Sequence, residues 1–410
     1  FRLWAQSLCS VSWGRSTALR CAARWHPAPV GRSRSAVSQG SAGAKRRVLL
    51  AQALAIDPRH GFAYLLRADA RRLKGDYDAA IADYAKGFEQ GVRYPEAYKN
   101  SGLLKQAKKD VAGAIADYDN ALELEPKSGV VLALRAQQRQ LKGDFEGAVA
   151  DYDKSFALGL RKAVVSYNAG LAHHAMGQLK AAIADYDWAI AIEPNHVAAL
   201  GNRAVAKRDL GDFDGALADY NRVVALAPNS ALAYNSRGAV QQGRGAFEEA
   251  RNDHDRALAI DSNLALGYVD RGILRYQLND WAGALADFDR GQELSADDGD
   301  DVPMCLWLAR TRLGGGAAAD VALESHLRKQ SSRAPNAFNE KVGAFLLGHT
   351  NEAEFLRNLT PEETAQRPAE ACARWFFAGI KRLLAGDVAG ARERFEKALA
   401  TGTTTTMEYW

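Results

Sequence analysis

Residues 75–84 read Gly-Asp-Tyr-Asp-Ala-Ala-Ile-Ala-Asp-Tyr, and variants of this stretch return along the chain at a constant interval of 34 residues. The interval is clearest at the last aspartate of the stretch, which recurs as Asp83, Asp117, Asp151, Asp185, Asp219, Asp253 and Asp287. A chain that repeats one unit without insertions builds a stack of similar elements, each of which buries its apolar face against the next. The repeat therefore predicts recognition by an extended surface and argues against catalysis.

Each unit has the pattern of two helices joined by a turn, with apolar residues spaced by three and four. A glycine such as Gly75 or Gly143 lies between the two helices, where a left-handed residue ends the first one. Lys109 and Asn279 replace this glycine in the second and seventh units. Asn tolerates the left-handed conformation, whereas Lys should cost about 1 kcal/mol. The predicted fold class is all-α.

The repeat also predicts how the chain is organised, because the motif is regular in the middle and degenerate towards the ends. The predicted parts are a basic N-terminal arm at 1–45, a partial repeat at 46–60, seven complete units at 61–298, a degenerate helical hairpin at 299–330, an irregular segment at 331–371 with short helices at most, and a C-terminal capping unit at 372–410.

The formal net charge of +4 is unevenly distributed. Residues 1–48 hold nine Lys and Arg and no acid, and subtracting these nine charges from +4 leaves −5 for the rest. The arm has the composition of an organelle transit peptide, which predicts a mitochondrial protein, or alternatively a plastid one. A retained basic arm, a plain disordered tail and an incomplete reading frame stay open as other interpretations. The acidic body disfavours binding along a phosphate backbone.

The units resemble the tetratricopeptide repeat. In the second unit the family pattern of small, aromatic and proline positions is met by Tyr98, Gly102, Ala114, Tyr118, Ala121 and Pro126. The resemblance implies a right-handed α-solenoid of helical hairpins, whose first helices line a concave groove. In this family such a groove binds extended peptides or partner helices.

The resemblance also implies which residues would line that groove and bind partner proteins. They are Lys99, Asn100, Gln106, Gln137, Gln140, Tyr167, Asn168, His174, Asn202, Arg208, Asn235, Gln242 and Tyr276. Asn100, Asn168 and Asn202 are suited to bond a ligand backbone, because an amide offers both a donor and an acceptor. The alternative is that they bond only neighbouring helices.

A second series pairs the recurrent aspartates with arginines at one fixed position of the first helix: Arg67, Arg135, Arg203, Arg237 and Arg271. Charges repeated down an array could form a binding ladder. The favoured interpretation is structural, in which Arg and Asp neutralise each other between helices and set their register.

The sequence shows no pattern that indicates catalysis, a cofactor or a metal. Cys9, Cys21, Cys305 and Cys372 form no Cys-x-x-Cys pair. His173 and His174 are adjacent, so on a helix they point about 100° apart and cannot share a metal without further ligands. The segment Gly314-Gly315-Gly316 lacks the Lys-Ser/Thr of a phosphate loop. No enzyme activity is predicted.

The leading hypothesis is a non-catalytic scaffold that binds protein subunits of a large mitochondrial complex through its groove and its basic arm. The alternative is an organellar RNA-associated or ribosomal adaptor whose arm contacts RNA. A third class, an enzyme, would need its chemistry in residues 331–371. The acidic run at 297–301 is interpreted as a solvated loop, because it lacks the ligand spacing of a calcium loop.

Overall fold

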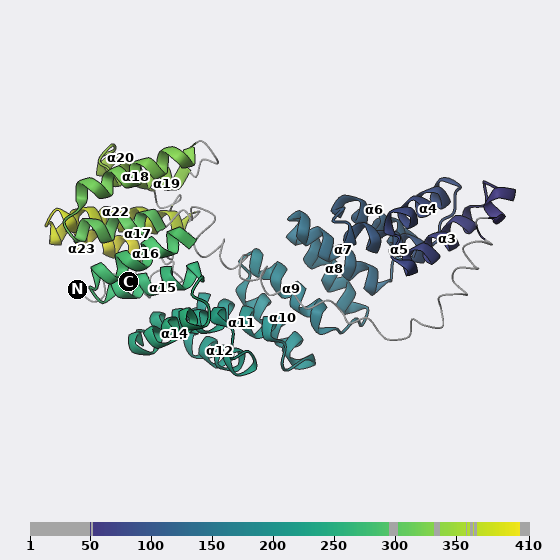
Figure 1. Cartoon of the computed structure of the whole chain (residues 1–410), viewed down its shortest axis with the longest axis horizontal. Coiled ribbons are helices and arrows are strands. Elements are labelled where there is room, and N and C mark those ends of the chain that lie inside the picture. The colour runs from purple at the N-terminus through teal and green to yellow at the C-terminus, as the bar shows by residue number, and fades with distance from the viewer. Residues whose placement is uncertain are drawn as a thin grey trace. The chain divides into compact units, whose positions relative to one another are not determined.

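The computed structural model describes residues 50, 52–294, 302–331, 337–357, 359–360, 364 and 367–401. This part of the chain is helical and contains no strand (Figure 1), so the prediction of an all-α helical-repeat fold is confirmed. The chain divides into two compact units between Pro194 and Asn195. We call them the N-terminal unit and the C-terminal unit. The basic arm at 1–45 and the acidic run at 297–301 lie outside the described residues.

The N-terminal unit holds four helical hairpins, in which each first helix packs against the helix that follows it. Residues 52–56 are also helical and precede them. The pairs are α3 (Gly61–Lys74) with α4 (Tyr77–Glu89), α5 (Pro95–Ala107) with α6 (Val111–Leu124), α7 (Gly129–Lys142) with α8 (Phe145–Ala157), and α9 (Ala163–Ala175) with α10 (Leu179–Ile192).

The C-terminal unit continues the same pairing. Its pairs are α11 (Val197–Asp209) with α12 (Phe213–Leu226), α13 (Ala231–Gly243) with α14 (Phe247–Ile260), α15 (Ala265–Gln277) with α16 (Trp281–Leu294), α17 (Val302–Arg312) with α18 (Gly316–Ser331), and α22 (Pro368–Leu384) with α23 (Val388–Leu399). Between the last two pairs lie α19 (Ala337–Leu346) and the single turn α20 (Glu352–Phe355).

Small residues let the two helices of a hairpin approach closely. A Cβ atom added at Gly102 would lie 2.6 Å from Cε1 of Tyr118, and one added at Gly170 would lie 2.5 Å from Cε1 of Tyr186. Both tyrosine rings are fully buried. The glycine therefore vacates the volume that the aromatic ring fills, which is why the sequence alternates small and aromatic residues 16 positions apart.

An Asp-x-x-Gly motif starts many of the second helices. The side chain of Asp144 accepts a hydrogen bond from Gly147 N at 2.9 Å, and Asp110 accepts one from Gly113 N at the same distance. This cap satisfies one of the backbone N–H groups that have no partner in the first turn of a helix. The aspartate is thus explained by helix capping.

The two non-glycine turn residues are left-handed, as the sequence predicts, with φ of 63° at Lys109 and 65° at Asn279. We expect Lys109→Gly to raise the free energy of unfolding by about 1 kcal/mol, because glycine carries no steric penalty in this conformation. Asn279→Gly is the matched control and should give a smaller change. Urea unfolding of the full chain measures both. Equal effects at the two positions would contradict the strain assigned to Lys109.

The C-terminal helices bury one apolar cluster that includes Trp307, Leu323, Phe345 and Phe377. The first helix of the last hairpin begins at Pro368, four residues before the predicted boundary at Cys372. This hairpin keeps the repeat geometry, because a Cβ atom added at Gly379 would lie 2.7 Å from Cε1 of Phe395.

Candidate functional site

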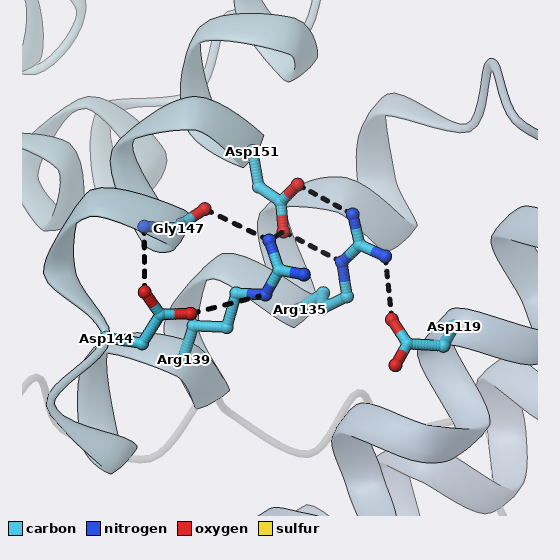
Figure 2. Close-up of polar contacts among 6 residues, drawn as sticks. All are labelled: Asp119, Arg135, Arg139, Asp144, Gly147 and Asp151. Carbon is cyan, nitrogen blue, oxygen red and sulfur yellow. Dashed lines mark hydrogen bonds and ion pairs between the residues drawn. The ribbon is translucent and has the colours of Figure 1, made fainter.

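The recurrent aspartates form a charged ladder inside the hairpins. In Figure 2 the carboxylate of Asp151 on α8 faces two arginines of α7. Arg135 donates to it from Nε at 2.8 Å and from Nη2 at 2.7 Å, and Arg139 donates from Nη1 at 2.9 Å. The Asp151 side chain is 1% exposed, so its charge is neutralised within the fold.

Each arginine of the series also links one hairpin to the previous one where a partner exists. Arg135 Nη1 donates to Asp119 on α6 at 2.7 Å (Figure 2), and Arg271 Nη1 donates to Asp255 on α14 at the same distance. The pKa values of Arg135 and Arg271 are raised above the ordinary arginine value. The largest causes are the hydrogen bonds to Asp151 and Asp287, and the bonds to Asp119 and Asp255 add to them.

The five arginines of the series all bond the aspartate of their own hairpin, at Asp83, Asp151, Asp219, Asp253 and Asp287. The structural interpretation of this series is therefore confirmed. A second cation four residues further along the first helix also contacts the aspartate in several units, as Arg71, Lys105, Arg139, Lys207 and Arg275 do. Sequence reasoning missed this second position, although its 34-residue recurrence is visible.

The fourth unit carries the weakest form of the ladder. Ala169 replaces the arginine, and His173 replaces the second cation, with its Nδ1 2.7 Å from Oδ2 of Asp185. Burial raises the pKa of Asp185. His173 thus has a structural partner in Asp185. Among the described residues, no group of three or more His, Cys, Asp or Glu side chains is placed to hold a metal ion.

The predicted groove residues lie at buried or half-buried positions of the first helices. The buried ones are Asn100, Tyr167, Asn202, Asn235, Gln242 and Tyr276. The half-buried ones are Lys99, Gln106, Gln137, Gln140, Asn168, His174 and Arg208.

Several of these side chains bond neighbouring helices. Gln106 Nε2 donates to Gln137 Oε1 at 3.2 Å and so links α5 to α7, while Gln242 Nε2 donates to Gln277 Oε1 at 3.0 Å and links α13 to α15. Asn100 Nδ2 donates to Asp69 Oδ1 on α3 at 3.2 Å. For these residues the structure supplies the bond to a neighbouring helix, and their role in partner binding stays a prediction.

The first helices of the N-terminal unit also carry exposed side chains, next to the predicted groove residues Asn100, Gln137 and Asn168. We define the first-helix face as residues 62, 66, 69 and 73 of α3 and the equivalent residues 34, 68 and 102 positions later on α5, α7 and α9. Spacings of four, three and four place these residues on one side of each helix. On α3, Phe62 is 54% exposed and Leu73 is 76% exposed, and on α7 Leu141 is 68% exposed.

The first-helix face combines apolar and polar side chains. Leu66, Val130 and Val164 are also exposed on it, whereas Glu96 and Asn168 add polar groups. The α3 and α5 helices contact each other, as do α7 and α9, so the faces of neighbouring first helices adjoin. Sequence reasoning missed the apolar members, because it sought polar residues there. Their recurrence at equivalent repeat positions is the signal that could have found them.

The sixth unit interrupts the buried aromatic series with His254. The Nδ1 of this fully buried ring donates to Asn235 Oδ1 at 2.9 Å, and Asn235 Nδ2 donates to Asp270 Oδ2 at 2.5 Å. The Nε2 of His254 has no hydrogen-bond partner within the described part of the chain. Burial lowers the pKa of His254 to about 4 and raises that of Asp270 to about 7.

We expect His254→Tyr to protect the protein against acid. The folded pKa of His254 lies below the ordinary value of 6.5, so its unfolded form binds the proton more strongly and stability falls as the pH drops from about 6.5 to 4. Asp270, Asp255, Arg208 and Arg271 are the charged groups near this cluster and remain in the variant.

The test is urea unfolding of both proteins at pH 7.5 and pH 5. Relative to wild type, the variant should gain on the order of 2 kcal/mol between the two pH values. Any cost of leaving Asn235 Oδ1 without its histidine donor is the same at both pH values. A wild-type-to-variant difference that does not change with pH would contradict a buried neutral His254.

The repeated hairpins define the class as a helical-repeat protein, a fold that generally serves as a protein-interaction scaffold. Two family profiles match the chain: one described as a tetratricopeptide repeat over residues 163–196, and one described as a TPR repeat over residues 204–245. These matches show that the chain contains tetratricopeptide repeats. The fold is typical of non-catalytic interaction scaffolds. No curated protein matches the chain.

Solved structures of repeat proteins are similar to parts of the chain. YrrB, described as a TPR protein with an unusual peptide-binding site, is 22% identical, with 45% of this chain and 95% of YrrB covered at a TM-score of 0.42. A tetratricopeptide repeat protein from Parabacteroides merdae is 18% identical, with 61% and 98% covered at a TM-score of 0.48. MamA is 25% identical, with 42% and 93% covered at a TM-score of 0.40.

None of the helices in the described residues is long and apolar enough to cross a membrane.

Proposed function

We propose that the chain is a non-catalytic scaffold that holds protein subunits of a large organellar complex, in a mitochondrion or alternatively in a plastid. The observation that carries the scaffold proposal is the exposed apolar stripe of the first-helix face, led by Phe62, Leu73 and Leu141. Large apolar side chains gathered on one surface mark interaction sites in soluble proteins.

The chemistry of the first-helix face supports an amphipathic protein segment as its ligand. Apolar side chains at Leu66, Val130 and Val164 offer area to bury, while Asn168 offers an amide that can both donate and accept. An amphipathic helix in an apolar groove is a common mode of recognition.

Charge and composition support the organellar setting. The nine Lys and Arg of residues 1–48, with no acid among them, have the composition of a transit peptide. The same basic segment is the observation that favours the second candidate, an organellar RNA-associated or ribosomal adaptor. The rest of the chain has a net charge of −5, which favours protein partners because nucleic-acid binding relies on positive charge that contacts the phosphates.

The experiment starts from cells that express the tagged protein, which are fractionated into organelles. The organellar extract is treated with nuclease, its native mass is measured, and comigrating proteins are identified by mass spectrometry. We expect a large, nuclease-resistant complex in the organellar fraction. A nuclease-sensitive particle would favour the RNA candidate, and a free monomer outside organelles would contradict the proposal.

A matched pair of variants assigns the partner to the first-helix face. The double variant Leu73→Glu/Leu141→Glu should lose the comigrating proteins. Its helical circular dichroism should be unchanged, because both side chains are exposed and the added charges therefore stay in contact with water. Leu399→Glu, also at an exposed leucine, should keep them. Equal retention by both variants would move the binding site elsewhere.

A further inference from the structure

Two loops of the N-terminal unit share one backbone conformation, which gives an internal reference. The loop after α4 contains Gly91 with φ of 80°, and the loop after α8 contains Gly159 with φ of 85°. Gly91 N bonds Phe88 O and Gly159 N bonds Phe156 O, both at 2.9 Å. Both loops then place an arginine at the same repeat position, Arg93 and Arg161.

The two arginines differ in what they meet on the next second helix. Arg93 Nη2 donates to Glu123 Oε2 on α6 at 2.6 Å. The residue equivalent to Glu123 beside Arg161 is Ala191 on α10, which is exposed. The second loop therefore presents an arginine where the first presents a completed ion pair.

Arg161 is held in place without a carboxylate. Its Nη1 donates to Phe156 O at 2.8 Å, and its guanidinium lies 5.8 Å from the centre of the Phe156 ring and 6.0 Å from the centre of the Trp188 ring. Within the described residues no carboxylate accepts from it. The side chain itself is exposed.

Trp188 is the second unusual residue of this surface. It is 60% exposed on α10, at a repeat position where the other units carry Lys86, Asn120, Lys154, Arg222, Arg256 and Arg290. Ile192, one turn further along α10, and Leu158, in the loop before Arg161, are exposed as well. Tryptophan and arginine are among the residue types that contribute most of the binding energy in protein interfaces.

We propose that Trp188, Arg161, Ile192 and Leu158 form a second docking surface for a protein segment that presents an Asp or Glu beside an apolar side chain. The carboxylate of the partner takes the place at Arg161 that Glu123 occupies at Arg93, and its apolar neighbour packs on the Trp188 ring. This surface lies on the loop after α8 and on the second helix α10, so it is separate from the first-helix face.

The probe is a phage library of random dodecapeptides selected on the folded full-length chain. Selected peptides are then measured by fluorescence anisotropy against two variants. Ala191→Glu should pair with Arg161 and fill the site internally, and Trp188→Lys restores a residue type common at this position. We expect a class of peptides with an acid next to an aromatic or aliphatic residue, whose affinity falls at least tenfold on both variants.

Matched controls separate this surface from general effects. Ala225→Glu adds the same charge at the equivalent position of the fifth unit, where Asn195 replaces the arginine, and should leave peptide affinity unchanged. Leu73→Glu/Leu141→Glu should also leave peptide affinity unchanged.

Replacing the acidic residue of the peptide by Gln should weaken its binding to the wild-type protein about tenfold, in line with the loss of a charge-assisted hydrogen bond to Arg161. The same replacement should not weaken binding to the Ala191→Glu variant. Selection without an acidic preference, or peptides insensitive to Ala191→Glu, would overturn the proposal.

Discussion

The variant Asp151→Ala is expected to lose about 3 kcal/mol of stability, because removing one member of a buried charge cluster leaves its partners uncompensated. Asp151 is 1% exposed and accepts from Arg135 and Arg139, which are 15% and 26% exposed. The partial exposure of both arginines lets water screen them, which places the expected loss at the lower end for buried pairs.

The measurement is hydrogen exchange of the α7 and α8 amides in the full chain, since a repeat array opens locally. Asp119→Ala is the matched control, because Asp119 accepts from the same Arg135 but is 50% exposed. Its expected loss is under about 1 kcal/mol. Similar protection in both variants would show that burial of Asp151 does not decide its contribution.

The second large effect is expected from Gly170→Val, which should cost about 3 kcal/mol by overpacking. A Cβ atom at Gly170 would lie 2.5 Å from Cε1 of Tyr186, and the Tyr186 ring is fully buried, so it cannot move aside. The branched valine side chain adds two further carbon atoms to the same space.

Gly201→Ala is the control for this variant. Gly201 also lies inside a first helix, but no heavy atom lies within 4 Å of an added Cβ atom. Alanine there should raise stability by about 0.5–1 kcal/mol through its better helix propensity. Thermal unfolding of both variants measures the contrast, and destabilisation of both by equal amounts would contradict the close approach at Gly170.

Much of the fold could be predicted because the same residue types recur at the same positions in seven units, so each structural role is indicated several times along the sequence. The Arg135–Asp151 pair and the left-handed Lys109 follow directly from the 34-residue recurrence. The C-terminal helices have no such repetition. Phe345 on α19 stacks on Phe355 with ring centres 4.1 Å apart, a tertiary contact that no periodicity in the sequence indicates.

The candidate site could be predicted less well, because the repeat pattern does not give the exposure of a polar side chain. Asn235 and Gln242 occupy positions that suggested a ligand, yet they bond Asp270 and Gln277 on the next first helix. These bonds depend on the residue at the facing position of another unit. Only the structure brings those two positions together.

The most direct test of the protein-interaction claim places a photo-cross-linking amino acid at Leu141, and separately at Leu399, in the tagged protein within its native complex. The first-helix face predicts a cross-link to a partner protein from position 141 and none from position 399. An intact complex that yields no cross-link from position 141, or equal cross-links from both, would contradict the assignment of the first-helix face as the binding surface.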